Sequence, residues 1–284
     1  MAEVEKGYFP DKATQMEIKQ GVDNIKGTLD STKNEVASIK NIQSEIKAAV
    51  NETQKVVSSV SGLAVFDKPG TYYWTCPANV KAVKLTMFGG GGSGDVLQGN
   101  FDSGERAQGG GGGAFVGGKF ISVIPGTTYP LIVGKGADPA PGNAPINNVS
   151  RGLTGGSSSA FGLICAGGQG DGKGAPSGNS SLVTAGAKAI HPYGQTSDVY
   201  AGFEAYTPYG KPGNAARVSD NGKDLMAGGG GAGYGSGGDG VAGYSSITPT
   251  IAGIGAGGGG VVFQAGRGPF SSMPGGDGII IIEW

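Results

Sequence analysis

Apolar side chains recur every seven residues between Ile18 and Val60, in two columns separated by alternating steps of four and three. This spacing is the a and d pattern of a left-handed coiled coil. The a column consists of Val22, Leu29, Val36, Gln43, Val50 and Val57. The d column consists of Ile18, Ile25, Thr32, Ile39, Ile46, Thr53 and Val60. The pattern predicts one long helix over residues 16–61, with Asp11 as a suitable N-cap before it.

The residues beside and within these columns predict how many helices meet. A lysine at every seventh position from Lys12 to Lys47 occupies the e position and supports the same phase. Isoleucine at d favours three or four strands, so we expect a parallel homotrimeric coiled coil about 65 Å long. Thr32, Gln43 and Thr53 would form polar layers that cost stability and resist register slips. The alternative is a single amphipathic helix that packs on its own domain, although roughly 40 residues of heptads exceed the usual length of such a helix.

After the helix stop at Ser61-Gly62, apolar positions alternate with a period of two, which predicts β-strands. Short strands are expected at residues 63–66, 72–75, 80–88, 119–124 and 129–133. The first two and the last two would form hairpins, because the Pro-Gly pairs between them suit type II turns. The four consecutive isoleucines Ile279–Ile282 fit only a covered strand. We expect that strand to insert beside the earlier strands or their copies in neighbouring chains.

Glycine contributes 60 of the 284 residues, roughly three times its usual share. Four tracts stand out, namely Gly89–Gly92, Gly109–Gly113, Gly228–Gly231 and Gly257–Gly260. A flexible linker is one interpretation, since glycine loses the most backbone entropy on ordering. Interspersed apolar residues and strands at both ends favour order instead. We therefore predict an all-β, glycine-rich domain with short antiparallel strands and packed polyglycine-II-type segments, which have three residues per turn.

Composition excludes several classes of protein. The formal net charge is −1, which gives no basic surface for nucleic acid. No apolar run approaches the roughly 18 residues that a membrane span needs, and the first residues lack the apolar region of a signal peptide. Cys76 and Cys165 are expected to be reduced and buried. A zinc site needs about four ligands, and His191 is the only histidine, so we expect no metal and no cofactor.

Motifs for catalysis are incomplete. Gly89, Gly91 and Gly94 match G-x-G-x-x-G after a strand, but a dinucleotide site needs a helix at the third glycine and an acid about 20 residues later. The two Gly-Gly-Asp-Gly stretches at 237–240 and 275–278 do not recur in tandem, as calcium-binding repeats must. There is no G-x-S-x-G elbow and no spacing that pairs two carboxylates. We expect a protein that is not an enzyme.

One interior segment is rich in aromatic residues and is the candidate binding site. It carries His191, Tyr193, Tyr200, Phe203, Tyr206 and Tyr209, and Tyr234 and Tyr244 would crown further loops. Tyrosine offers a large contact area at little rotamer cost and dominates adaptable binding loops. Aromatic faces also stack on sugar rings. The alternative is that these rings cap the glycine-rich core.

Four stretches together resemble the glycine-rich domain of bacteriophage tail fibres and their tip adhesins. They are residues 72–92, which join Tyr-Tyr-Trp-Thr-Cys-Pro to a strand and the first tract, 124–134, 155–162 and 275–284. The resemblance covers about Leu63 to Trp284. It implies a homotrimeric fibre on a phage or a phage-tail-like bacteriocin, made in the host bacterial cytoplasm without a signal peptide. The short rod departs from the long shafts of such fibres and suggests a stubby fibre near a baseplate or tail tip.

The heptads and the resemblance together lead to the hypothesis that each part of the chain has its own role. Residues 1–15 would attach to a baseplate or tail-tip protein, 16–61 would hold the trimer, 62–136 would form a β module, and 137–284 would form the loop-bearing tip. The tip would bind a glycan or protein on the bacterial surface, with no nucleic acid and no membrane insertion. Two alternatives remain. The chain could be a structural spacer that carries a separate adhesin, or a fibre that cleaves glycans.

Overall fold

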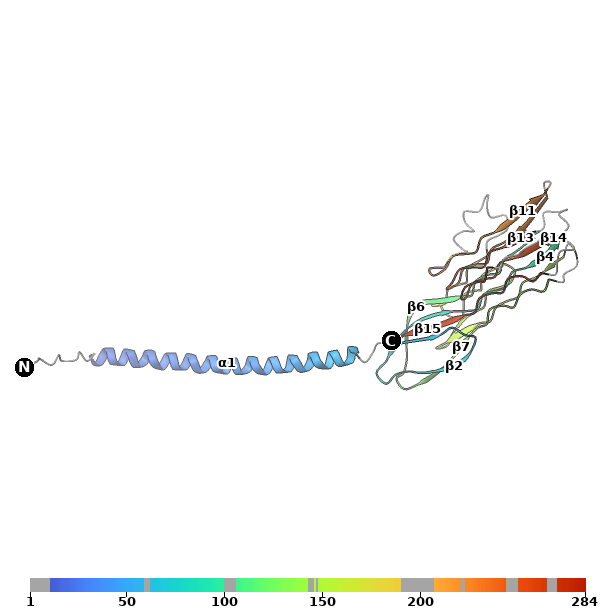
Figure 1. Ribbon diagram of the computed structural model, residues 1–284. Coiled ribbons are helices and arrows are strands. Elements are labelled where there is room, and N and C mark those ends of the chain that lie inside the picture. The colour runs from blue at the N-terminus through green and yellow to red at the C-terminus, as the bar shows by residue number, and fades with distance from the viewer. Residues whose placement is uncertain are drawn as a thin grey trace, which may run out of the picture. The chain divides into compact units, whose positions relative to one another are not determined.

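The computed structural model describes residues 11–58, 62–99, 106–142, 146, 148–189, 207–220, 223–243, 250–264 and 270–284. The chain divides into two compact units, Met1–Ser59 and Val60–Trp284. The first contains the one helix of the described residues, and the second contains all of their strands (Figure 1).

The first unit is built on helix α1, Lys12–Ser58. Asp11 is its N-cap, because the Asp11 Oδ1 atom accepts a hydrogen bond of 2.9 Å from the backbone N–H of Thr14. This bond lowers the pKa of the Asp11 carboxyl. Within the helix, the hydroxyls of Thr28, Thr32 and Ser44 each donate a hydrogen bond to the backbone carbonyl four residues earlier. The sequence therefore predicted both the helix and its N-cap correctly.

The prediction of a parallel trimeric coiled coil is wrong. The structure has a single helix, and the a and d side chains from Ile18 to Val50 are exposed. Their apolar members are 45–70% exposed, with Val36 and Ile25 at the two limits. The helix and its apolar stripe follow from the chain's own period. The number of helices in the coiled coil was inferred from the residue types at the d positions. These residue types favour one number of helices over another once helices associate, but they do not show that the helices associate. The side chains of Thr53, Val57 and Val60 lie outside the described residues.

Two antiparallel four-stranded sheets form a sandwich at one end of the second unit. The first has the order β1-β15-β3-β6 and consists of Leu63–Phe66, Ile279–Glu283, Ala82–Phe88 and Phe115–Ser122. The second has the order β10-β9-β7-β2 and consists of Leu163–Cys165, Ser158–Ala160, Thr128–Val133 and Gly70–Thr75. The core between them includes Leu85 and Ile280 from the first sheet and Leu131 and Cys165 from the second. The all-β character of this unit is thus confirmed.

The expected hairpins are wrong, although their strands exist. β1 pairs with β15 and not with β2, and β6 pairs with β3 and not with β7. The turn at Pro125-Gly126 is tight. Gly126 has a φ of 74°, and the backbone N–H of Thr127 donates a hydrogen bond to the carbonyl of Ile124. It carries the chain from one sheet of the sandwich to the other. A Pro-Gly turn predicts a reversal of direction, but it does not predict that the two strands pair.

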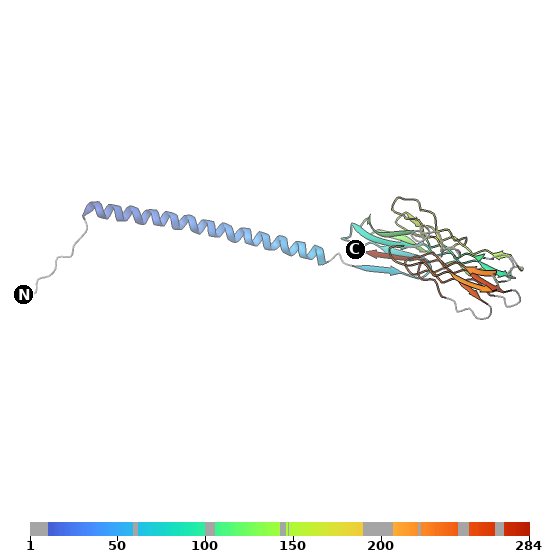
Figure 2. The same ribbon diagram turned by 90° about the horizontal axis from the view of Figure 1, so that it is seen from above.

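Two smaller sheets lie at the other end of the unit (Figures 1 and 2). One has the order β11-β12-β5 and consists of Ala216–Asp220, Lys223–Ala227 and Arg106–Ala107. The other has the order β13-β14-β4-β8 and consists of Val241–Gly243, Val261–Gln264, Val96–Gly99 and Val149–Ser150. Three of their pairings are parallel, β12 with β5, β13 with β14 and β14 with β4. The expectation of antiparallel strands alone is therefore wrong at this end.

The glycine tracts connect these sheets and bond sideways to one another. In the first tract, three successive N–H groups donate to three different segments, and the next three N–H groups donate to the same segments in the same order. The acceptors of residues 89, 90 and 91 are the carbonyls of Ala114, Gly156 and Gly276. Those of residues 92, 93 and 94 are the carbonyls of Gly111, Leu153 and Met273, at 2.8–3.1 Å for the six bonds. A repeat of three residues is that of an extended glycine helix.

The second tract shows the same repeat with other neighbours. Residues 110 and 113 donate to segment 255–258, residues 111 and 114 to segment 166–169, and residues 112 and 115 to segment 184–187. A Cβ added to Gly110 would lie 2.1 Å from the carbonyl oxygen of Gly92, so neighbouring tracts touch backbone to backbone. We call this laterally bonded array the glycine lattice. Because these two tracts bond to three neighbouring segments in turn, the lattice restrains the segments that enter and leave it.

Candidate functional site

Two of the eight candidate aromatic residues, Tyr209 and Tyr234, belong to the described part of the chain, and they lie side by side. Their rings stack with centroids 5.4 Å apart and an interplanar angle of 26°. The other six lie outside the described residues. They are His191, Tyr193, Tyr200, Phe203, Tyr206 and Tyr244.

Backbone contacts bring the two tyrosines together. The Thr207 hydroxyl donates to the carbonyl of Gly233 and accepts from the N–H groups of Tyr209 and Gly210. A Cβ on Gly210 would lie 2.2 Å from the carbonyl oxygen of Gly235, so the two backbones can approach this closely only because residue 210 is glycine. The turn that carries Tyr209 therefore contacts the backbone at Gly233 and at Gly235, the residues on either side of Tyr234.

Beneath the pair lie two phenylalanines of the first sheet. Phe88 on β3 and Phe115 on β6 stack with centroids 5.0 Å apart and an angle of 8°. Tyr209 and Tyr234 meet Phe88 edge-on at 5.5 and 5.7 Å, the geometry that aromatic quadrupoles favour. Phe88 is fully buried, whereas Tyr209 is 41% exposed. The tyrosines therefore cover an apolar core and still present surface to solvent.

The same sheet face continues into charged and aromatic residues that the sequence analysis did not single out. Lys84 on β3 pairs with Glu283 on β15, with 2.9 Å between Nζ and the carboxylate and both side chains 45% exposed. The hydrogen bond to Glu283 raises the pKa of Lys84, with a smaller contribution from Tyr209. Phe120 stands opposite Lys84 in the register and is 78% exposed. The alternation of β6 predicts that Phe120 faces outward, but its neighbours follow only from the register.

A second aromatic group lies at the sandwich end and has a structural role. Trp74 packs against Tyr129, Phe161 and Trp284 with centroids 5.5–6.2 Å apart. Phe161 and Gly162 form the two-residue turn between β9 and β10, both with positive φ of 51° and 77°, as a type I′ hairpin requires. Residues from the four stretches that carry the family resemblance therefore meet in one core.

Aspartates in the glycine-rich sequence serve the lattice as hydrogen-bond acceptors. Asp277 accepts from the N–H of Gly136 at 2.8 Å, and Asp239 accepts from the N–H of Asn214 and the hydroxyl of Thr250. Within the described residues no group of three His, Cys, Asp or Glu side chains is placed to hold a metal ion. Cys76 and Cys165 are free and buried, and burial raises the pKa of Cys165 to about 12. A thiol with so high a pKa is a poor nucleophile at neutral pH.

Asp95 is the one charged side chain in the described core. It is fully buried, and it accepts from Arg151 Nη1 at 2.9 Å and from the N–H of Gly152 at 2.8 Å. Burial raises the pKa of Asp95 above the ordinary carboxyl value of 3.8, and the bonds to Gly152 and Arg151 oppose that rise in part. The folded unit therefore binds this proton more tightly than the unfolded chain does.

The raised pKa predicts a pH dependence. Stability from Asp95 is present at low pH and is lost as the pH rises through the folded-state pKa, because ionisation is harder in the folded unit. Wild type should therefore gain stability relative to Asp95→Asn as the pH falls from 7 to about 4, by about 1.4 kcal/mol for each unit of pKa elevation. Urea unfolding of both proteins at several pH values measures this. A relative loss in wild type on acidification would contradict it.

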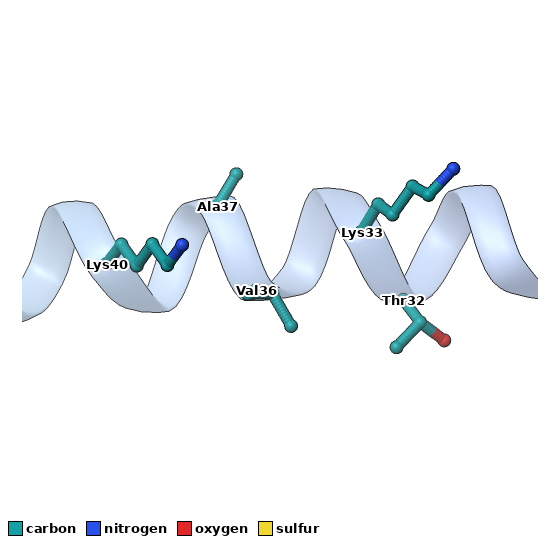
Figure 3. A pocket seen from close by; sticks show the side chains of 5 residues that line it. All are labelled: Thr32, Lys33, Val36, Ala37 and Lys40. Carbon is teal, nitrogen blue, oxygen red and sulfur yellow. The ribbon is translucent and has the colours of Figure 1, made fainter.

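Helix α1 carries a shallow hollow lined by Thr32, Lys33, Val36, Ala37 and Lys40. Figure 3 shows Thr32 and Val36 pointing to one side of the helix and Lys33 and Ala37 to the other. The hollow is the open space between side chains of successive turns and encloses no ligand site. Among the helices of the described chain, none has the length and apolar character needed to cross a membrane.

Comparison with family models identifies residues 67–284 as a glycine-rich domain. The match begins just after β1 and runs to the last residue, so it includes every strand of the sandwich except β1, together with the glycine lattice and the stacked tyrosines. A search of curated proteins found no match.

Proposed function

We propose that this chain, which belongs to the glycine-rich domain family, attaches a phage or a phage-tail-like particle to the bacterial cell surface. It would act by binding and not by catalysis. The surface molecule would be a glycan or a protein, and the glycine-rich unit would contact it. The protein would be part of the particle and would be made in the bacterial cytoplasm.

The observation that carries this proposal is the glycine lattice. Binding sites lose affinity when loops must be ordered on contact, and a rigid support removes that cost. The lattice supplies such a support, because its tracts bond on three sides through peptide groups. It uses almost no side chains for this purpose, so the segments between the tracts can vary without disturbing it. Recognition by varied loops on a constant support is what attachment to different hosts requires.

Helix α1 would lie between the two functional segments in the chain. Its 47 residues extend about 70 Å at 1.5 Å per residue. The segment 1–15, of which residues 1–10 lie outside the described residues, would dock on a baseplate or tail-tip protein.

Adsorption to bacteria tests the proposal. The full-length protein, labelled at its N-terminus with a fluorophore, is mixed with a broad panel of bacterial strains and unbound protein is removed. We expect binding to a narrow subset of strains, because loops that recognise one surface structure should discriminate between strains. Heat-unfolded protein provides the control for nonspecific adhesion.

Binding to no strain by the folded protein would contradict the proposal. Co-purification with a particle protein in that case would favour the alternative, a structural spacer that carries a separate adhesin. Release of reducing sugar from bacterial envelopes would instead support a fibre that cleaves glycans.

A further inference from the structure

The outer face of the first sheet carries a row of four residues, one from each strand. The register aligns Leu63 with Glu283, Glu283 with Lys84, and Lys84 with Phe120. The residues next to them in the chain, such as Val83 and Ile282, face the core and are buried. The row is therefore an outward-facing strip across the whole width of the sheet.

The strip has apolar ends and a charged centre. Leu63 and Phe120 are 64% and 78% exposed, and the Lys84–Glu283 ion pair lies between them. Most of the Phe120 side chain is exposed, so it contributes little to the core of its own unit. Val65 on the same face is also 49% exposed. An exposed aromatic ring beside an accessible ion pair suits a ligand that is both apolar and rich in hydroxyls.

Tyr209 borders the same strip. A Cβ on Gly117 would lie 3.1 Å from the Tyr209 hydroxyl, and one on Gly118 would lie 3.2 Å from Lys84 Cε. Because these two glycines are adjacent on β6, the Tyr209 hydroxyl and the Lys84 stem lie next to each other. Phe120 follows three residues after Gly117 on the same strand. Two exposed aromatic side chains thus flank the ion pair.

We propose that this surface, made of Tyr209, Lys84, Glu283 and Phe120, binds sugar rings of a bacterial surface polysaccharide. A pyranose ring has C–H faces that pack on aromatic rings and hydroxyls at its rim. The Glu283 carboxylate accepts hydrogen bonds from such hydroxyls and the Lys84 ammonium donates to them. The paired charges sum to zero, which fits a neutral sugar better than an ionic ligand. The inference rests on the proposed function and names its ligand class.

The charged centre argues against a protein as the ligand. Charged residues are depleted at the centre of protein–protein interfaces, and covering the Lys84–Glu283 pair with apolar atoms would cost desolvation energy. Sugar hydroxyls replace the water around both charges and avoid that cost. The surface is a strip along a sheet face and not a closed pocket, which suits a segment of a long polymer.

Binding to an array of purified bacterial surface polysaccharides and lipopolysaccharide O-chains tests the inference directly. Wild-type protein should bind at least one of them. Phe120→Ala should weaken that binding at least tenfold, since truncation of aromatic anchors dominates binding losses, and Glu283→Gln should weaken it as well. Tyr73→Ala is the matched control, because Tyr73 is 73% exposed on the outer face of the other sheet. It should bind as wild type does.

The outcomes separate this inference from the proposed function. Adsorption to cells without binding to any polysaccharide, or equal adsorption by Phe120→Ala and wild type, would overturn the sugar surface and leave attachment standing with a protein receptor. Polysaccharide binding that Phe120→Ala abolishes would support the surface even if no strain adsorbs the protein. Equal losses in Phe120→Ala and Tyr73→Ala would also overturn it, since the effect would not be local.

Discussion

Replacing Gly91 by alanine should destabilise the glycine-rich unit by about 3–5 kcal/mol, near the upper end of what one substitution does. The new Cβ would lie 1.8 Å from the carbonyl oxygen of Ala256 and 2.3 Å from its carbonyl carbon. Neither chain can move away freely. The N–H of Gly91 is bonded to Gly276, and the N–H of Ala256 is bonded to Gly253. A methyl group therefore forces apart backbones that the lattice holds from several directions.

A series of glycine substitutions makes this prediction quantitative. At Gly156 the nearest atom to a new Cβ would be the Lys135 amide nitrogen at 2.9 Å, and at Gly117 it would be the Tyr209 hydroxyl at 3.1 Å. The loss in stability should therefore fall in the order Gly91, Gly156, Gly117. Gly27→Ala is the control, because nothing lies within 4 Å of a Cβ at that helical position. It should stabilise α1 by about 1 kcal/mol.

Urea unfolding followed by near-ultraviolet circular dichroism reports on the glycine-rich unit, since the two tryptophans, Trp74 and Trp284, pack together there. Far-ultraviolet dichroism reports on the helix. If Gly91→Ala unfolded at the wild-type urea concentration, the tracts would have to separate easily enough to admit a side chain, and the lattice could not be the rigid support that attachment requires.

The sequence predicted those features that depend on neighbouring residues. The heptads predicted α1 and the period of two predicted the main strands, because each pattern reflects the geometry of its own segment. The isoleucines of Ile279–Ile282 predicted a covered strand, and β15 does lie between β1 and β3. The number of helices in the predicted coiled coil was wrong, because it depends on other chains and not on the local pattern.

Strand pairing and the binding surface could not be predicted in the same way. β1 pairs with a strand at the other end of the chain, and β6 and β7 follow each other yet belong to different sheets. Phe120 lay within a predicted strand, but its position beside Lys84 and Glu283 depends on two registers that join distant segments. Tyr234 was a candidate because it is aromatic. That it stacks on Tyr209 depends on backbone contacts between glycines, which no side-chain pattern reveals.

Replacing Ile280 by alanine should destabilise the glycine-rich unit by about 2–5 kcal/mol, the cost of a cavity left by a buried isoleucine. Ile280 is fully buried in the core between the two sheets and stands between Phe66 of β1 and Met87 of β3. Among the described residues, its strand alone connects β1 to the rest of its sheet. A cavity here weakens packing on both neighbouring strands. Among the described residues β1 pairs with no strand other than β15, whereas β3 also pairs with β6.

The matched control is Ile251→Ala, which makes the same chemical change at a side chain that is 81% exposed. It should alter stability by no more than about 0.5 kcal/mol. Refolding rates add a second measure. β15 joins segments more than 200 residues apart in sequence, and such non-local pairing slows folding. If Ile280→Ala slowed refolding as well as weakening the fold, β15 would already be in place in the transition state. Equal stability of the two variants would show that the last strand adds little to the sandwich, contrary to its central position.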